Sequence, residues 1–402
     1  MTQDIATALI HHPYQPPGDF QAPQPGIFKA STVFFSNVAA LEAREWRDKS
    51  GYTYGLHGTP TTFILEERLA TLEGGLQCLL VPSGLAAIAC VSLSLLKTGD
   101  EVLLPDNVYG PSKALADAEL AALGISCRLY DAMNPDSLAG TLSAGTKVVW
   151  LEAAGSVTME FPDLPRLVDI CRRAGVVTAL DNTWGAGLAF DAFDLDGEGR
   201  GVDLSIHALT KYPSGGGDVL MGSIVTRDET LHMRLKMTHM RLGFGVAAND
   251  AELVLRALPS LPLRYDAQDA SARRLAEWLS DREEVAQVLH PAIAGSPGHE
   301  HWLALCGPGG RAAGIFSIVF HARFSRRQVN DFCDALQLFR IGYSWGGPIS
   351  LVVPYDIGEM RNEAVSHWPH SGRLVRLCIG LETVDDLKLD LARALATLPT
   401  SR

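Results

Sequence analysis

The chain has 402 residues and a mass of 43.3 kDa, more than one compact core usually holds, so two or three domains are expected. Asp and Glu outnumber Lys and Arg by 46 to 34, and the net charge of -12 argues against nucleic-acid or anionic-membrane binding. A hydrophobic content of 47% excludes a disordered or collagen-like chain.

Residues 1–55 are rich in proline, glycine and aromatic residues and show little periodicity, which predicts an N-terminal arm that contacts a neighbouring subunit. The first basic residue is Lys29, so we expect no secretory signal and a cytoplasmic protein. The charge-free segment 74–96 is interrupted by Pro82 and Gly84, so we expect no membrane span. Seven cysteines without a CxxC pair predict free, buried thiols.

Residues 56–248 alternate between strand and helix patterns, which predicts an α/β domain with a mainly parallel sheet covered on both faces. Expected helices cover 85–96, 113–123 and 164–174, and expected strands cover 101–105, 126–130, 147–151, 176–180 and 202–206. Residues 249–402 predict a smaller C-terminal α+β domain, with helices at 251–258 and 271–279 and strands at 315–320 and 374–379.

Two charged residues follow strands of the larger domain, where open α/β sheets bind ligands. Asp181 ends the strand 176–180, where a carboxylate either caps backbone or holds a cation or protonated ring. Lys211 follows the strand 202–206 and precedes a glycine loop, so burial can lower its pKa toward nucleophilic use. A solvated surface lysine is the alternative interpretation.

Two further features favour a phosphorylated, planar ligand. Gly84 and Leu85 begin the helix 85–96, whose free N–H groups suit a phosphate, although a plain helix cap has the same pattern. Tyr109, in a loop after a strand, can cover a planar ring or simply pack. An amine, a carboxylate, a helix N-terminus and an aromatic together meet the needs of pyridoxal 5′-phosphate (PLP).

Ordered motifs over nearly the whole chain carry a family resemblance. They are Tyr54-Gly-Leu-His-Gly-Thr59, Leu72-Glu-Gly-Gly75, Pro82-Ser-Gly-Leu-Ala-Ala87, Glu152 with Gly155-Ser-Val-Thr-Met-Glu160, Asp181-Asn-Thr-Trp184, Thr210-Lys-Tyr212, Tyr343-Ser-Trp-Gly-Gly347 and Arg376-Leu-Cys-Ile-Gly-Leu-Glu382. The sequence resembles the Cys/Met-metabolism family of PLP enzymes (fold type I), and within it most the cystathionine β-lyases.

The resemblance implies a role for each site residue. Lys211 would carry the Schiff base, Asp181 would hold the ring nitrogen and Tyr109 would stack on the ring and share in catalysis. The phosphate ligands would be Gly84, Leu85 and Thr210, joined by Tyr54 of the neighbouring subunit, which would also contact substrate; Arg376, Ser344 and Trp345 would bind substrate. Catalytic dimers would pair into a homotetramer.

The implied reaction is α,β-elimination from an amino-acid thioether such as cystathionine, a step of methionine biosynthesis and transsulfuration, with Lys211 taking the Cα proton. Trp345, and Gly155-Ser156 where γ-acting relatives commonly show Asn-Pro, favour β- over γ-elimination. A γ-acting relative, such as a cystathionine γ-lyase, cystathionine γ-synthase or methionine γ-lyase, is the alternative.

The sequence departs from the family pattern near the expected phosphate. Leu56 stands where relatives usually have a cross-subunit arginine, and His57 can compensate if it turns toward the phosphate. Ala208 replaces a small hydroxyl residue and Gly216 replaces a histidine.

A function of another class is a serine hydrolase. Residues 342–346 match the GxSxG nucleophile elbow around Ser344, and Asp356 and His370 follow in a suitable order. An elbow needs a helix after it, whereas Gly347-Pro348 and the apolar residues 349–353 follow the motif and do not predict a helix. The GxGxxA match at 307–312 precedes a strand instead of opening a helix, and the histidines lack metal-type companions, so no metal is expected.

Overall fold

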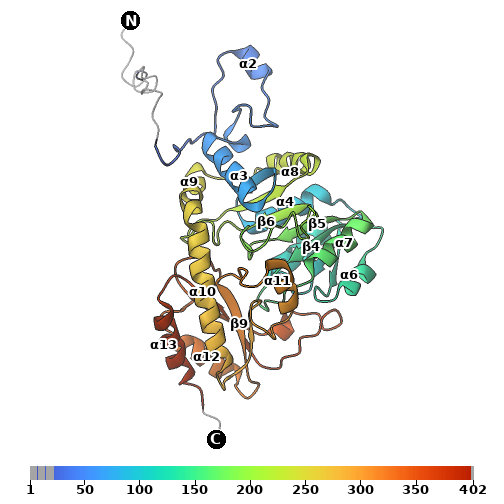
Figure 1. Cartoon of the computed structure of the whole chain (residues 1–402). Helices are drawn as coiled ribbons and strands as arrows, with labels where there is room; N and C mark the ends of the chain where they lie inside the picture. The colour runs from blue at the N-terminus through green and yellow to red at the C-terminus, as the bar shows by residue number, and fades with distance from the viewer. Residues whose placement is uncertain (1–6, 8–13, 15–21, 400–402) are drawn as a thin grey trace.

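The computed structural model describes Thr7, Tyr14 and residues 22–399. Figure 1 shows two sheet-containing regions beside the long helix α10 (Leu261–Ser280), with α2 (Val38–Glu42) standing away from both.

The first region is built on a seven-stranded sheet in the order β1-β7-β6-β5-β4-β2-β3. Only β7 runs antiparallel to its neighbours, so the predicted mainly parallel sheet is confirmed. The strands are β1 (Gln77–Val81), β2 (Glu101–Pro105), β3 (Ser126–Tyr130), β4 (Thr146–Glu152), β5 (Val177–Asp181), β6 (Leu204–His207) and β7 (Gly222–Thr226).

Helices cover both faces of this sheet. On β2, Val102 and Leu104 pack in a buried cluster with Ile88 of α4, whereas Leu103 packs in a cluster with Leu65 of α3 (Pro60–Glu73). This alternation follows from the two-residue period of a strand. The helices of the region are α3, α4 (Gly84–Leu95), α5 (Gly110–Leu115), the π-helical η2 (Ala116–Leu120), α6 (Pro135–Thr141), α7 (Leu164–Ala174) and α8 (Glu229–Leu242).

The second region contains a five-stranded sheet in the order β10-β11-β12-β9-β8. Its strands are β8 (Val285–Leu289), β9 (Ile315–Phe320), β10 (Arg340–Ile341), β11 (Leu351–Tyr355) and β12 (Leu374–Cys378). The remaining helices are α9 (Ala248–Ala257), η3 (Leu258–Ser260), α10, α11 (His299–Cys306), α12 (Arg326–Ala335), η4 (Ile357–Glu359) and α13 (Val384–Leu395). Residues of α10, α12 and α13 share one buried cluster with this sheet.

The sequence pattern predicts a shorter helix than α10, because buried polar residues interrupt the apolar stripe of this helix. Gln268 donates a hydrogen bond from Nε2 to the carbonyl oxygen of Gly347 at 2.8 Å. One turn earlier, Arg264 donates from Nη1 to the carbonyl oxygen of Tyr212 at 2.7 Å. These tertiary contacts extend the helix to 20 residues, where the sequence predicts only 271–279.

Most of the predicted N-terminal arm can be compared with the structure, although residues 1–6, 8–13 and 15–21 lie outside the described residues. The described part contains α2 (Val38–Glu42) and η1 (Gly55–His57), and none of residues 22–57 is buried. The side chain of Phe34 is 94% exposed. The division of the chain at residues 55 and 248 stays a prediction.

Candidate active site

A cavity of about 160 Å³ lies beyond the carboxyl ends of β4 and β5, and Ile315 and Arg376 of the second sheet also line it. Its position matches the expectation for an open α/β sheet. Eight of the ten predicted site residues line it: Gly84, Leu85, Tyr109, Asp181, Thr210, Lys211, Trp345 and Arg376.

Lys211 and Asp181 are the charged pair of the cavity. Burial lowers the pKa of Lys211, while the negative charge of Asp181 opposes that shift. Burial raises the pKa of Asp181, while the hydrogen bond from the Thr183 N–H to its Oδ1, at 3.0 Å, acts in the other direction. A lysine with a lowered pKa can act as a nucleophile or base near neutral pH, and a buried carboxylate is stabilised by any cation placed beside it.

A second buried carboxylate, Glu152, lies beside Asp181. The two residues are register partners at the ends of the parallel strands β4 and β5. Glu152 Oε2 accepts a hydrogen bond from the backbone N–H of Tyr109 at 2.9 Å, so the carboxylate holds the loop that carries this aromatic ring. Burial, reinforced by the charge of Asp181, raises the pKa of Glu152.

The N-terminus of α4 forms one end of the cavity. Ser83 caps the helix by accepting a hydrogen bond from the N–H of Ala86 at 3.0 Å. A Cβ on Gly84 would lie 2.7 Å from the Cβ of Ala208, so only glycine allows this approach between α4 and the loop after β6. Thr210 also lines this end. The arrangement provides free N–H groups and a helix dipole for an anion.

Arg376 of β12 forms the opposite, cationic side of the cavity. Its side chain is buried, and its guanidinium carbon lies 5.6 Å from the ring centroid of Trp345. Within the described part of the chain, the Nε and Nη2 atoms of Arg376 have no hydrogen-bond partner, and neither has the Oγ atom of Ser344. Buried, unpaired donors of this kind suit a carboxylate, which a guanidinium binds by two parallel hydrogen bonds.

These features fit the PLP cofactor that the sequence resemblance implies. The helix N-terminus at Gly84 suits a phosphate, Tyr109 can cover a planar ring, and Asp181 can pair with a protonated ring nitrogen. Trp345 lies over the amine of Lys211, with Nζ at 4.8 Å from the ring centroid. Lys211 therefore faces a side chain of the loop between β10 and β11 of the second region.

The structure does not bring Tyr54 to this cavity. Tyr54 lies in the described part of the arm, half exposed, and its hydroxyl accepts a hydrogen bond from Ser31 Oγ at 3.3 Å. His57 stacks on Trp46, with 4.9 Å between ring centroids, and its Nδ1 is 2.9 Å from Thr53 Oγ1. Neither His57 nor Leu56 lines the cavity of its own chain.

The geometry around Ser344 does not form a hydrolase elbow. Ser344 has φ of 101°, but the chain continues to β11 without entering a helix. Its unpaired Oγ makes no nucleophile–base hydrogen bond with His370. The GxGxxA segment precedes β9, as predicted.

Among the described residues, no three or more His, Cys, Asp or Glu side chains come together in a group that could hold a metal ion. In the same part of the chain, no helix combines the length and apolar character that crossing a bilayer requires.

Two polar residues of the cavity were given no role by sequence reasoning. Glu152 follows the predicted strand 147–151 directly, which is the signal that identified Asp181. Thr183 accepts a hydrogen bond from the N–H of Ala208 at 2.9 Å through its Oγ1, and so joins the ends of β5 and β6. Its place in the motif Asp181-Asn-Thr-Trp184 is the signal that marks it in the sequence.

Comparisons with known proteins identify the family of the chain. Residues 6–396 match the family described as Cys/Met metabolism PLP-dependent enzyme. A putative cystathionine β-lyase of Rhizobium johnstonii is 40% identical over 375 residues, which cover 92% of this chain and 91% of the relative. A cystathionine β-lyase of Bordetella avium is 39% identical over 372 residues, covering 91% and 90%. The solved cystathionine γ-synthase of Xanthomonas oryzae pv. oryzae, in complex with aminoacrylate and cysteine, superposes with a TM-score of 0.83 at 30% identity, covering 99% of this chain and 100% of that chain.

Proposed function

This chain belongs to the Cys/Met metabolism family of PLP-dependent enzymes and is a PLP-dependent lyase, and from this premise we propose that it is a cystathionine β-lyase. The reaction cleaves the Cβ–S bond of cystathionine and, with one water, yields homocysteine, pyruvate and ammonia. The observation that carries the proposal is the meeting of Lys211, Asp181 and Arg376 at one cavity.

Three roles follow from the charges of the lining. Bound PLP supplies an electron sink that makes the Cα–H bond of an amino acid acidic. Lys211, whose pKa burial lowers, binds the cofactor and moves the Cα proton. Asp181 holds the ring nitrogen, and Arg376 binds the substrate carboxylate.

The remaining lining residues orient the reactants. Tyr109 covers one face of the ring and is held by Glu152. Gly84, Leu85 and Thr210 bind the phosphate, and Trp345 supports the substrate beside Arg376. Ser344 does not line the cavity, and its proposed contact with substrate is supported by its buried Oγ, which has no partner among the described residues. The preference for β-elimination rests on Trp345 and on Ser156 of the loop after β4, both of which line the cavity.

The active assembly proposed here is a homotetramer of catalytic dimers in the cytoplasm. The arm, residues 1–55, packs on the partner subunit, where the partner's Tyr54 completes the phosphate site; residues 56–248 bind PLP and residues 249–402 form the smaller domain. The exposed Phe34 and the distance of Tyr54 from its own cavity support this arrangement. Sedimentation equilibrium should give four times the chain mass; a monomer would contradict it.

The product of the reaction tests the proposed function. Holoenzyme and cystathionine should release pyruvate and homocysteine in equal amounts. Release of 2-oxobutyrate instead would identify a γ-acting enzyme, the second candidate, which the similarity to a cystathionine γ-synthase structure supports. No keto-acid product from any sulfur amino acid would contradict both.

A further inference from the structure

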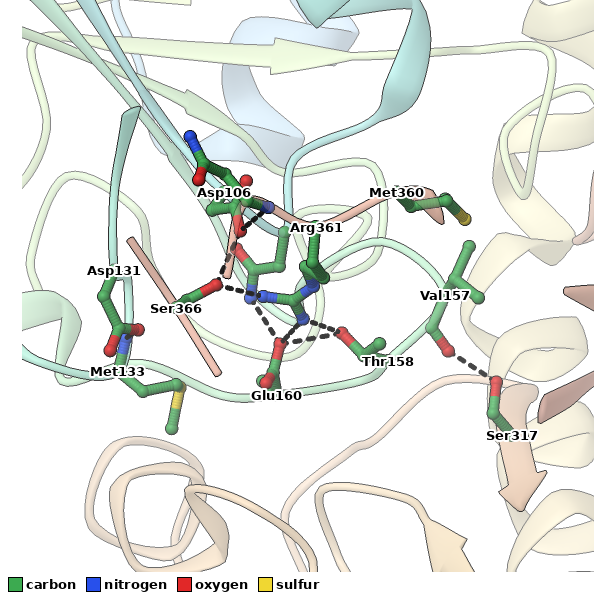
Figure 2. A network of polar contacts seen from close by, with 12 residues as sticks. Asp106, Asp131, Met133, Val157, Thr158, Glu160, Ser317, Met360, Arg361 and Ser366 are labelled. Carbon is green, nitrogen blue, oxygen red and sulfur yellow. Dashed lines mark hydrogen bonds and ion pairs between the residues drawn. The ribbon is translucent and has the colours of Figure 1, made fainter. Parts of the chain in front are cut away.

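A buried polar network joins the loop after β4 to the second region of the chain, outside the set of predicted site residues. Figure 2 shows Arg361 in contact with Glu160, Thr158 and Ser366, and Ser366 also in contact with Asp106. Arg361 Nη2 forms an ion pair with Glu160 and donates to Thr158 Oγ1 at 2.9 Å. Its Nη1 donates to Ser366 Oγ at 3.1 Å. Only 6% of the Arg361 side chain is exposed, so solvent does not screen these contacts.

Glu160 is the centre of the network on the side of the first sheet. Its Oε2 also accepts hydrogen bonds from Thr158 Oγ1 at 2.7 Å and from Asn107 Nδ2 at 2.9 Å. Asn107 lies two residues before Tyr109, in the same loop. A Cβ on Gly155 would lie 2.3 Å from Asn107 Nδ2, so the loop after β4 approaches the Tyr109 loop as closely as glycine permits.

Asp106 forms a second anchor for the segment that carries Arg361. Its Oδ2 accepts hydrogen bonds from the N–H of Asn362 at 2.9 Å and from Ser366 Oγ at 2.6 Å. Lys113 pairs with Asp106 Oδ1 at 2.8 Å and donates to the carbonyl oxygen of Met360 at 2.9 Å. The segment 360–366 is therefore held to the carboxyl end of β2 by both backbone and side-chain contacts.

The other side of the same loop is tied to the strand next to Arg376. Val157 and Met159 line the cavity with left-handed backbone conformations, φ of 69° and 54°. The carbonyl oxygen of Val157 accepts a hydrogen bond from Ser317 Oγ at 2.5 Å, and Ser317 is the cross-strand partner of Arg376. Non-glycine residues keep such conformations only where their surroundings hold them.

We propose that Arg361 is a positioning residue of the lyase: through Glu160 it sets the distance from the Val157–Met159 wall and the Tyr109 loop to Arg376. This inference rests on the proposed function, because it assigns Arg376 to the substrate carboxylate. Arg361 touches neither the cavity nor the reacting atoms, so its effect reaches the reaction through geometry alone.

Arg361→Met and Arg128→Met make a matched pair of variants for the test. Arg128 also pairs with a glutamate, but this residue, Glu101, lies at the amino end of β2. The network of Arg361 lies at the other end of the same strand, where Asp106 and Asn107 follow Pro105. In the holoenzyme, Arg361→Met should lower kcat/KM for cystathionine by about 10- to 100-fold, as displacement of a binding group by about 1 Å does. The visible circular dichroism of bound PLP should also change, because the Tyr109 loop moves. Arg128→Met should leave both at the parent values.

Two further variants keep the test decisive if Arg361→Met does not fold. Arg361→Lys retains the charge but loses the paired contacts to Thr158 and Ser366, and Glu160→Gln removes the ionic partner; each should lower kcat/KM and alter the dichroism. The double variant Arg361→Lys/Glu160→Gln should lose no more than the more damaging of the two single variants, because the two residues act as one unit.

Parent-like kcat/KM and dichroism in the Arg361 and Glu160 variants would overturn the inference. That result is separate from a failure of the proposed function. If the parent yields 2-oxobutyrate instead of pyruvate, the β-lyase proposal fails, while the dichroism and the kcat/KM for that reaction still test Arg361.

Discussion

Two glutamates of the seven-stranded sheet, Glu101 at the amino end of β2 and Glu152 at the carboxyl end of β4, have opposite electrostatic environments. Arg128 binds Glu101 through Nε at 2.6 Å and Nη2 at 2.9 Å, and Thr146 Oγ1 donates to it at 2.5 Å. These contacts lower the pKa of Glu101 to about 2. Glu152 has no cationic partner among the described residues, and burial beside Asp181 raises its pKa to about 8.

The difference shows which end of the sheet is built for stability and which for chemistry. At the amino end, the Glu101 carboxylate has its ionic and hydrogen-bond partners, Arg128 and Thr146, within the chain. At the carboxyl end, Asp181 and Glu152 are buried side by side and Arg376 keeps unpaired donors. Such an arrangement lowers the stability of the fold and is typical of sites whose partners are a cofactor and a substrate.

The largest effect should come from Lys211→Ala, which removes the lysine amine from the cavity at the carboxyl end of the seven-stranded sheet. Turnover of cystathionine should fall by on the order of 10⁴-fold, because both the covalent link and the base are lost. The midpoint of thermal unfolding of the cofactor-free protein should change little, since the gain from removing a buried cation is offset by the loss of its attraction to Asp181. Pyruvate assays and calorimetry measure the two effects, and parent-like turnover would exclude Lys211 as the base.

Arg376→Lys should have the next largest effect. Lysine keeps the charge but cannot make two parallel hydrogen bonds to a carboxylate, so kcat/KM should fall by about 100-fold. Most of the loss should appear in KM if the carboxylate contact is equally strong throughout the reaction. A shift of less than about 3-fold in steady-state kinetics would argue that Arg376 does not bind the carboxylate.

Glu152→Gln should remove a pH dependence of stability. The folded pKa of Glu152 is raised, so the folded protein binds a proton between the unfolded pKa of 4.5 and about 8, and stability falls as pH rises through this window. The free energy of unfolding of the cofactor-free variant, minus that of the parent, should increase from pH 5 to pH 8.5 by on the order of 2 kcal/mol. Thermal unfolding at both pH values measures this gain; an equal difference at the two would contradict it.

Arg128→Met should have the smallest effect and leave turnover unchanged. The pair is partly exposed, so its loss should cost about 1 kcal/mol at pH 7. Because the pKa of Glu101 is lowered, the stabilisation is present above pH 4.5 and disappears as pH falls toward 2. The difference in stability between parent and variant should therefore shrink in unfolding experiments as the pH falls from 4.5 toward 2. A loss of turnover would show that the two ends of the sheet are coupled.

Local signals allow the sequence to predict elements whose ends are marked. The strands at 101–105, 126–130 and 315–320 and the helix at 164–174 agree with the structure in both bounds. The predicted helix 113–123 instead consists of α5 and the π-helical η2, which begin at Gly110. The apolar period does not reveal this π-helical stretch, because it is only five residues long, about one turn.

Long-range contacts explain what the sequence could not predict at the site. Strand ends identified Asp181 and Lys211, and family motifs added Arg376 and Trp345. Glu160 and Arg361 are 201 positions apart, and no local pattern relates them. Tyr54 lies away from the cavity of its own chain, so its predicted role depends on a second subunit.

The two hydrogen bonds of α10 have a mechanical consequence. Arg264 holds the backbone next to Lys211, and Gln268, one turn later, holds the backbone two residues beyond Trp345. One helix thus fixes both the backbone beside Lys211 and the backbone beside Trp345. The separation of the Lys211 amine from the Trp345 indole therefore stays constant if the two sheets rotate about α10. Any widening of the cavity has to occur at the opposite margin, where residues 360–366 meet residues 155–160.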